Sequence, residues 1–213
     1  RPVDDRDITD MINAYLRWEQ AILRVDEALS RHKIFLERAT GEDRVNLIDK
    51  ENNLLKEKQK LLSSLNNEQR REQATLNQRL TKWGVNTNSA TQGASDVERL
   101  VMARQSQLDS LTNQINAIKT DTPQRENLIN RRDELKEGIE ALTDDFDRYI
   151  EISNNISGKS NEWWEIQSQI LDNQLARIEE GLKKYDDRLT MLDQQISLLG
   201  NVRDNRPKEI EKE

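Results

Sequence analysis

The spacing of the apolar residues constrains this chain more than any other feature of its sequence. Over long stretches they recur at alternating steps of three and four residues, as in a helix that buries one stripe. Between these stretches lie most of the residues that interrupt regular structure: Pro2, Gly41, Gly84, Gly93, Pro123, Gly158, Gly200 and Pro207. The pattern predicts an all-α protein, an elongated antiparallel helical bundle or coiled coil of about five long amphipathic helices.

The composition favours such a bundle over a compact globule. Hydrophobic residues make up 34% of the chain and charged residues another 34%, against averages of about 45–50% and about 25%. A compact globule of this composition would be short of core, whereas a bundle buries only a narrow stripe on each helix. The regular apolar period also argues against disorder over most of the chain, because disordered segments do not keep one.

The first half of the chain predicts a helical hairpin. Residues 1–83 are expected to hold helices over about 8–39 and 43–82, separated by Gly41. Residues 84–95 are small and polar and include two glycines, so we expect a flexible linker there.

The second half, residues 96–200, predicts a three-helix antiparallel segment, because short breaks make neighbouring helices antiparallel. Ser95 and Glu98 match a capping box, Pro123 suits a helix start, and residues 157–160 are expected to break the helix. Residues 201–213 are expected to lead toward a further helix. The chain begins with Arg1 rather than Met, so we expect one domain of a larger protein, with its localisation left open.

The last of these helices has the longest stripe. It is expected to pack against its neighbours through Trp164, Ser168, Leu171, Leu175, Ile178, Leu182, Tyr185, Leu189, Leu192, Ile196 and Leu199.

Charge and composition argue against several classes of partner. A net charge of −7 disfavours nonspecific nucleic-acid binding, which needs clustered Lys and Arg. No apolar run approaches the ~18–20 residues of a membrane span, so no transmembrane segment is expected. The absence of cysteine excludes disulfides, thiolate metal sites and cysteine nucleophiles.

No group of residues predicts catalysis, a metal site or a cofactor, and a small-molecule ligand is not expected. His32, the one histidine, lacks the Glu of a helical Glu-x-x-His metal pattern, because Leu29 stands there. The acidic residues 4–7 and 144–147 lack the glycine and ligand spacing of a calcium loop. We therefore expect no enzyme. Three polar residues inside apolar stripes are expected to fix helix register: His32, Arg104 and Arg132.

Two regions are the candidate partner-binding sites. Residues 66–75 are polar on every side of their predicted helix, so we expect them to protrude into solvent or to face something outside this chain. The second region is a tryptophan pair, in which the second residue fits the stripe and the first flanks it. The candidates are Gln69, Arg70, Gln73 and Trp83 near the polar stretch, and Trp163 and Trp164 in the pair.

These features predict a noncatalytic helical domain that serves as a protein-interaction, scaffold or assembly module of a larger protein, with self-association among its modes. An alternative is a helical region of a secreted or translocated bacterial protein, such as a toxin receptor-binding arm or a secretion translocator. A second alternative is a membrane-associated, curvature-sensing dimer, although the acidic second half of the chain opposes the basic face that it would need.

Overall fold

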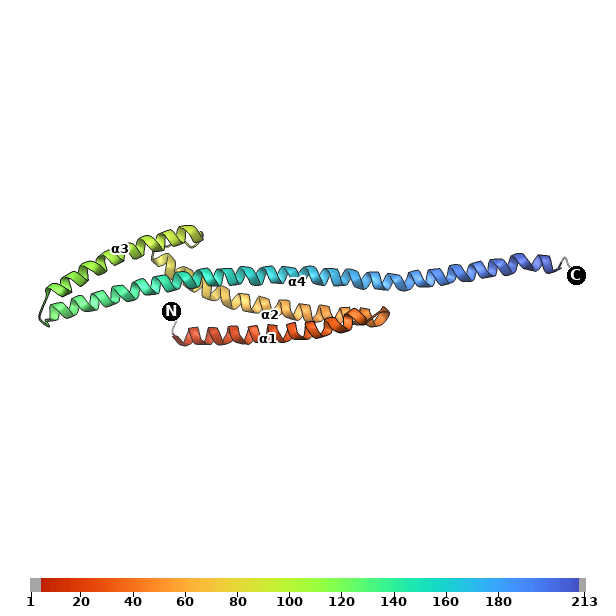
Figure 1. Ribbon diagram of the computed structural model, residues 1–213, viewed down its shortest axis with the longest axis horizontal. Coiled ribbons are helices and arrows are strands. Elements are labelled where there is room, and N and C mark those ends of the chain that lie inside the picture. Colours follow the sequence, from red (N-terminus) through yellow and green to blue (C-terminus); the bar gives the residue numbers. More distant parts are fainter. Residues whose placement is uncertain (1–4, 211–213) are drawn as a thin grey trace. The chain divides into compact units, whose positions relative to one another are not determined.

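The structure is a computed structural model that describes residues 5–210, with side chains from 9 to 203 (Figure 1). These residues form four helices and no strand, which confirms the all-α prediction. The helices are α1 (Asp5–Arg38), α2 (Gly41–Lys82), α3 (Ala90–Ala117) and α4 (Pro123–Ile210).

The chain divides into two compact units. Unit 1 comprises Arg1–Arg17 and Ser63–Asn161, and unit 2 comprises Trp18–Leu62 and Glu162–Glu213. Three of the helices, α1, α2 and α4, contribute to both units, whereas α3 belongs to unit 1 alone.

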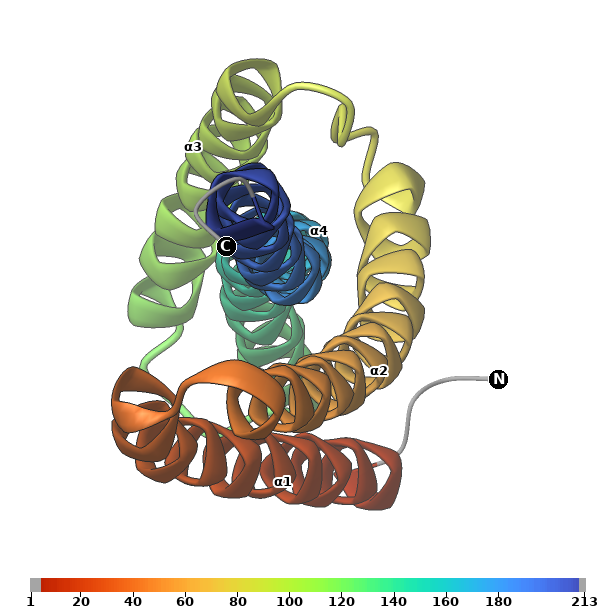
Figure 2. The same ribbon diagram turned by 90° about the vertical axis from the view of Figure 1, so that its right-hand side faces the viewer.

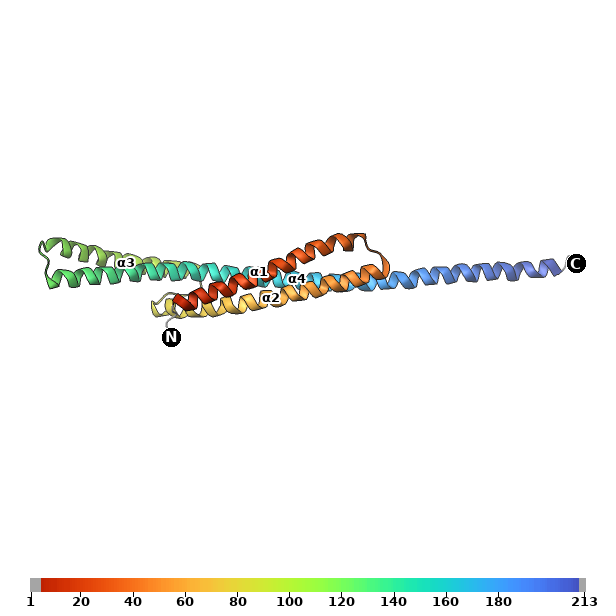
Figure 3. The same ribbon diagram turned by 90° about the horizontal axis from the view of Figure 1, so that it is seen from below.

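Unit 2 is built from the second part of α1, the first part of α2 and the second part of α4. The turn between α1 and α2 uses Gly41 at φ 61°, a left-handed conformation that costs glycine little (Figure 3). Its buried apolar residues come from all three segments: Ile22, Val25, Ile48, Leu55, Leu62, Ile166 and Ile170.

Unit 1 packs the C-terminal part of α2, the connection after it and α3 against the first part of α4 (Figure 2). In its main apolar cluster, Leu80 and Leu142 are fully buried, and Trp83, Leu100, Val101, Tyr149 and Ile150 pack around it. The cluster consists of Leu80, Val85, Val97, Leu142 and Phe146.

The start of α3 differs from the expected capping box at Ser95. Ser89 is the N-cap, and its hydroxyl accepts the backbone N–H of Gln92 at 3.2 Å. Gly93 lies inside the helix, and only glycine fits there without a shift of its surroundings, because a Cβ would meet the carbonyl oxygen of Asn86 at 2.6 Å. Val85, in the connection, is only 4% exposed. The glycine in this stretch therefore serves close packing within a helix.

The expected break at residues 157–160 is wrong, because α4 continues through it as one helix. Ile152 and Ile156 are buried just before this point, and Ser160 accepts a hydrogen bond from Asn66 of α2 at 3.1 Å. These contacts outweigh the cost of about 1 kcal/mol for glycine inside a helix. The described residues therefore hold four helices, and the three-helix antiparallel segment expected for residues 96–200 consists of only two helices, α3 and α4.

Gly200 likewise does not end the last helix, since α4 continues to Ile210. Of the segment expected to lead away from the bundle, residues 201–210 are helical, and residues 211–213 lie outside the described part of the chain.

Amide side chains on α2 set its antiparallel register against α4 in each unit. In unit 2, Asn52 accepts from Asn173 at 2.9 Å, and Gln59 donates to Gln167 at 2.9 Å. In unit 1, Asn66 donates to Ser160 at 3.1 Å, and Gln73 donates to Ser153 at 3.0 Å. The four amides recur at every seventh residue of α2, so each faces α4.

Candidate interaction surface

The longest apolar stripe of the chain lies exposed on α4, within unit 2. Nine large side chains at alternating steps of three and four are each 51–68% exposed. We call this set the α4 stripe: Leu171, Leu175, Ile178, Leu182, Tyr185, Leu189, Leu192, Ile196 and Leu199. Met191, Leu198 and Val202 are exposed beside it. The prediction that this stripe packs inside the bundle is wrong.

A different face of α4 makes the contacts with α2. Ile166 and Ile170 are buried, Arg177 pairs with Asp49 at 2.8 Å, and Glu180 accepts the backbone N–H of Gly41 at 3.0 Å. The contact between α4 and α2 ends near Glu180, where α2 begins, and α4 continues beyond that point (Figure 1). From residue 182 to 199, every side chain of α4 is exposed. The stripe is thus left uncovered by the described residues of unit 2.

An ion-pair cluster joins the three segments of unit 2. The ammonium of Lys58 lies 2.6 Å from Asp26 of α1 and 2.9 Å from Glu162 of α4. Burial lowers the pKa of Lys58, but hydrogen bonds and attraction from the two carboxylates outweigh it and raise the pKa above its usual value. The charge of Lys58 therefore serves internal packing.

The tryptophan pair stands near the start of the α4 stripe. The rings of Trp163 and Trp164 are edge-to-face, with centroids 4.8 Å apart. Trp163 is half-buried, and its carbonyl accepts from Gln59 at 3.3 Å. Trp164 is 64% exposed. The face of α4 that meets α2 runs through Trp163, so Trp163 is the packed member and Trp164 the one that faces solvent.

The polar part of α2 does not simply protrude, as expected, but is partly buried in unit 1. Gln69 is 4% exposed, and Gln73 is half-buried and bonded to Ser153. Arg70 is exposed. The expectation that this stretch faces away from the chain is therefore wrong for Gln69 and Gln73, whose faces of α2 are covered.

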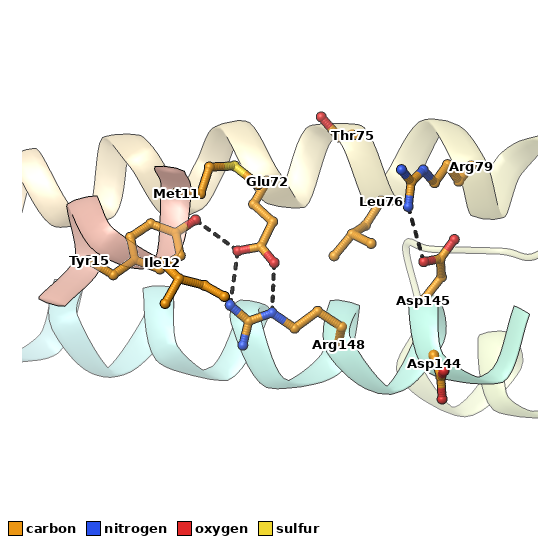
Figure 4. A pocket seen from close by; sticks show the side chains of 10 residues that line it. All are labelled: Met11, Ile12, Tyr15, Glu72, Thr75, Leu76, Arg79, Asp144, Asp145 and Arg148. Atoms are coloured by element: carbon orange, nitrogen blue, oxygen red, sulfur yellow. Dashed lines mark hydrogen bonds and ion pairs between the residues drawn. The ribbon is translucent and has the colours of Figure 1, made fainter. Parts of the chain in front are cut away.

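Glu72, from the same stretch, is central to an ionic network (Figure 4). Its carboxylate receives the Tyr15 hydroxyl at 2.8 Å and two guanidinium bonds from Arg148, at 2.7 and 3.0 Å. Burial, followed by the bond to Glu72, raises the pKa of Tyr15 well above its usual value. The bonds to Glu72 likewise raise the pKa of Arg148, despite its partial burial.

This network lines a cavity of about 410 Å³ in unit 1. Beside it, Arg79 pairs with Asp145 at 3.3 Å, and burial raises the pKa of Asp145, an effect that Arg79 partly offsets. The remaining lining is Met11, Ile12, Thr75, Leu76 and Asp144. Each charge is neutralised by a partner on another helix: Glu72 by Arg148, and Asp145 by Arg79. Such pairs hold the helices together, which indicates a structural role for this network.

The residues expected to fix register have different surroundings. His32 Nε2 lies 2.6 Å from the carbonyl oxygen of Leu47, so it donates to α2. The guanidinium of Arg104 stacks over the ring of Trp83 at 4.4 Å. Trp83 is itself half-buried against the apolar cluster of unit 1. Arg132 pairs with its neighbour Asp133 at 3.0 Å.

The sequence prediction missed both the exposure of the α4 stripe and the amides of α2. The amides were detectable, because Asn52, Gln59, Asn66 and Gln73 are spaced seven apart. The exposure was not, because the periodicity of a stripe is the same whether its partner lies in the same chain or outside it.

Neither a family model, a curated protein nor a solved structure matches this chain. Among residues 9–203, whose side chains the structure describes, no cluster of three or more histidine or acidic side chains is placed to hold a metal ion. In the same part of the chain, no helix combines the length and apolar character needed to cross a membrane.

Proposed function

We propose that this chain is a noncatalytic helical module that binds protein through the α4 stripe, as an assembly or scaffold part of a larger protein. The observation that carries the proposal is the uncovered stripe, in which nine large apolar side chains are each more than half exposed. Contiguous apolar surface on this scale marks interaction sites, whereas single exposed apolar residues are ordinary.

The stability of the helix supports the same conclusion. From residue 182 to 199, α4 has no buried side chain, so its helical state there depends on helix propensity and on contacts within the helix itself, such as the pair of Lys183 with Glu180. Isolated helices are marginal in water, and most helix stability comes from packing an apolar face. A partner along the stripe would supply that packing.

The polar residues favour binding over catalysis. Several half-buried charges of both units are held in ion pairs across the helices, such as Glu72 with Arg148 and Lys58 with Asp26. General acid–base chemistry needs a titratable group directed at a substrate. Among the other candidate partner contacts, Trp164 and Arg70 remain attractive because both are exposed. We expect a protein partner, and neither nucleic acid nor a small molecule.

Site-specific photocrosslinking tests the proposal. A photoreactive residue replaces Leu189 on the stripe or, as the matched control, Asp187 on another face of the same turn. In an extract of the source cells, we expect protein adducts from position 189, whether with this chain or another, and few from position 187. Equal labelling at both positions, or none at 189, would contradict the proposal.

A further inference from the structure

We infer that the occupant of the α4 stripe is a second copy of this chain, aligned parallel and in register as a two-stranded coiled coil. This inference rests on the proposed function and names its partner.

The stripe has the unbroken heptad of a coiled-coil seam. The a positions are Leu175, Leu182, Leu189 and Ile196, and the d positions are Leu171, Ile178, Tyr185, Leu192 and Leu199. No polar residue interrupts these nine positions. In a parallel dimer in register, each a or d residue packs beside its own counterpart, so apolar residues meet apolar residues along the entire seam.

The charges beside the seam select the parallel orientation. Each of four consecutive e positions is acidic: Asp172, Glu179, Asp186 and Asp193. An antiparallel pair would bring e positions of both copies together and oppose carboxylate to carboxylate. A parallel pair instead sets each g position against the e position five residues later on the partner.

In the parallel arrangement, no g residue of one copy repels the acidic e residue that it faces on the other copy. Arg188 at g would face Asp193 of the other copy, and by symmetry this pair forms twice. The other g positions between 174 and 195 are Gln174, Gly181 and Gln195, which carry no charge. Charge complementarity thus favours two parallel copies of the same helix.

The available area also suits a dimer. At roughly 60–100 Å² for each of the nine exposed side chains, the stripe presents on the order of 700 Å² per chain. Standard interfaces bury about 800 Å² per partner. The face of α4 that contacts α2, through Ile166, Ile170 and Arg177, is a different one, so the contacts within unit 2 can stay in place.

Sedimentation equilibrium gives the first test. We expect the purified chain to show twice its 24.9 kDa mass at micromolar concentrations. Leu189→Glu should weaken the association at least 100-fold, because it buries a carboxylate in the seam. The control Asp187→Asn, at the outward f position, should leave it within about 3-fold. Because Leu189 is exposed in the single chain, Leu189→Glu should not unfold the monomer. Circular dichroism should therefore show that the variant keeps most of the helical content of the wild type.

Disulfide trapping gives the orientation, since the chain has no cysteine of its own. Leu199→Cys should link to itself under mild oxidation, because residue 199 lies beside its counterpart only in the parallel pair. Gln194→Cys, at the outward f position, is the control and should link at least 10-fold more slowly. If Leu199→Cys instead links to Leu171→Cys in a mixture and not to itself, the pair is antiparallel and the inference is wrong.

A charge swap tests the contact between copies. Arg188→Glu should weaken association about 3- to 30-fold, because it sets Glu against Asp193 twice. Adding Asp193→Arg should restore most of that loss. Residues 188 and 193 are five apart on one helix and do not face each other there, so rescue would report the contact between two chains.

The inference and the proposed function fail separately. A chain that stays monomeric at 100 μM, or whose mass is unchanged by Leu189→Glu, overturns the homodimer. If crosslinks from position 189 to a different protein persist in that case, the proposed interaction function stands. If neither self-association nor crosslinking occurs, both are wrong.

Discussion

At the scale of single residues, unit 1 depends on a carboxylate that is shared among three helices. Glu72 of α2 is held by Tyr15 of α1 and by Arg148 of α4, and its side chain is 13% exposed. A carboxylate so placed is stable as a charge only while its donors remain. The pairing ties α1 and α4 to the part of α2 that looks uniformly polar in sequence.

Arg148→Met should therefore destabilise the protein by about 1–3 kcal/mol, because it leaves Glu72 half-paired. Urea unfolding followed by circular dichroism measures the change. The matched control is Arg71→Met, because the Arg71 side chain is 76% exposed and pairs with Glu68; its effect should stay below about 0.5 kcal/mol. Similar losses in the two variants would show that the network around Glu72 contributes little.

Asp96 predicts a pH-dependent contribution to stability. It accepts the backbone N–H of Asn86 at 2.9 Å and the amide of Gln92 at 3.1 Å, and the first of these bonds is the main reason why its pKa lies below the usual 3.8. A lowered folded-state pKa stabilises the fold above the unfolded-state value, and the contribution is lost as the pH falls through the folded-state pKa.

Asp96→Asn should thus be less stable than the wild type at pH 7, and the difference should shrink as the pH falls below about 4. Urea midpoints between pH 2.5 and 7 give the measurement. Asp109→Asn, on the exposed face of α3, is the control and should change stability by less than about 0.5 kcal/mol. A deficit that stays constant down to pH 2.5 would contradict the role of the carboxylate charge.

At the scale of elements, glycines in this chain have opposite roles inside helices. In α3, a Cβ at Gly93 would meet Asn86 O at 2.6 Å and Phe146 Cε2 at 2.9 Å, so glycine allows α3, its preceding connection and α4 to approach closely. In α4, Gly158 has nothing within 4 Å of a Cβ. A glycine therefore marks a turn, a close packing point or only a weak spot in a helix, according to its neighbours.

Gly93→Ala and Gly158→Ala should change stability in opposite directions. Gly158→Ala should stabilise unit 1 by about 0.5–1 kcal/mol, through helix propensity. Gly93→Ala should destabilise it by about 1–3 kcal/mol, because the overlap with backbone and ring outweighs the same propensity gain. Thermal or urea unfolding of the two variants decides. A stabilised Gly93→Ala would show that α3 relaxes away from Asn86 at little cost.

At the scale of the whole molecule, apolar heptad positions fall into two populations. Those of α2, such as Leu55 and Leu62, are at most 2% exposed, whereas those of the α4 stripe are at least 51% exposed. The first population maintains the fold of one chain, and the second is available to another chain.

The two populations should differ in how their effects depend on concentration. Leu62→Ala should cost about 2–5 kcal/mol at any protein concentration. Leu189→Ala should cost little at nanomolar concentrations and progressively more as the chain associates, because binding stabilises the folded state by mass action. Melting temperatures across a thousandfold dilution make the comparison. A concentration-independent loss in Leu189→Ala would mean that this side chain packs within its own chain.

The spacing of apolar residues is enough to predict the helical class and most of the apolar faces of the helices. The stripe of α1 is confirmed at Tyr15, Ile22 and Val25, all of which are buried, while Ile8 lies outside the described side chains. The period of an apolar face is a local property, since an α-helix turns once every 3.6 residues whatever surrounds it. It can therefore be read directly from spacing.

Where glycine interrupts a helix, and what covers each apolar stripe, depends on contacts between segments that are distant in the sequence. The breaks expected at Gly158 and Gly200 are absent, and Gly93 lies within α3. Around Gly158 and Gly93, packing contacts outweigh a propensity cost near 1 kcal/mol. Gln69 is covered and Leu189 is exposed, the reverse of what their polarities predict. Burial depends on which surfaces of distant segments meet, and a one-dimensional pattern does not contain that information.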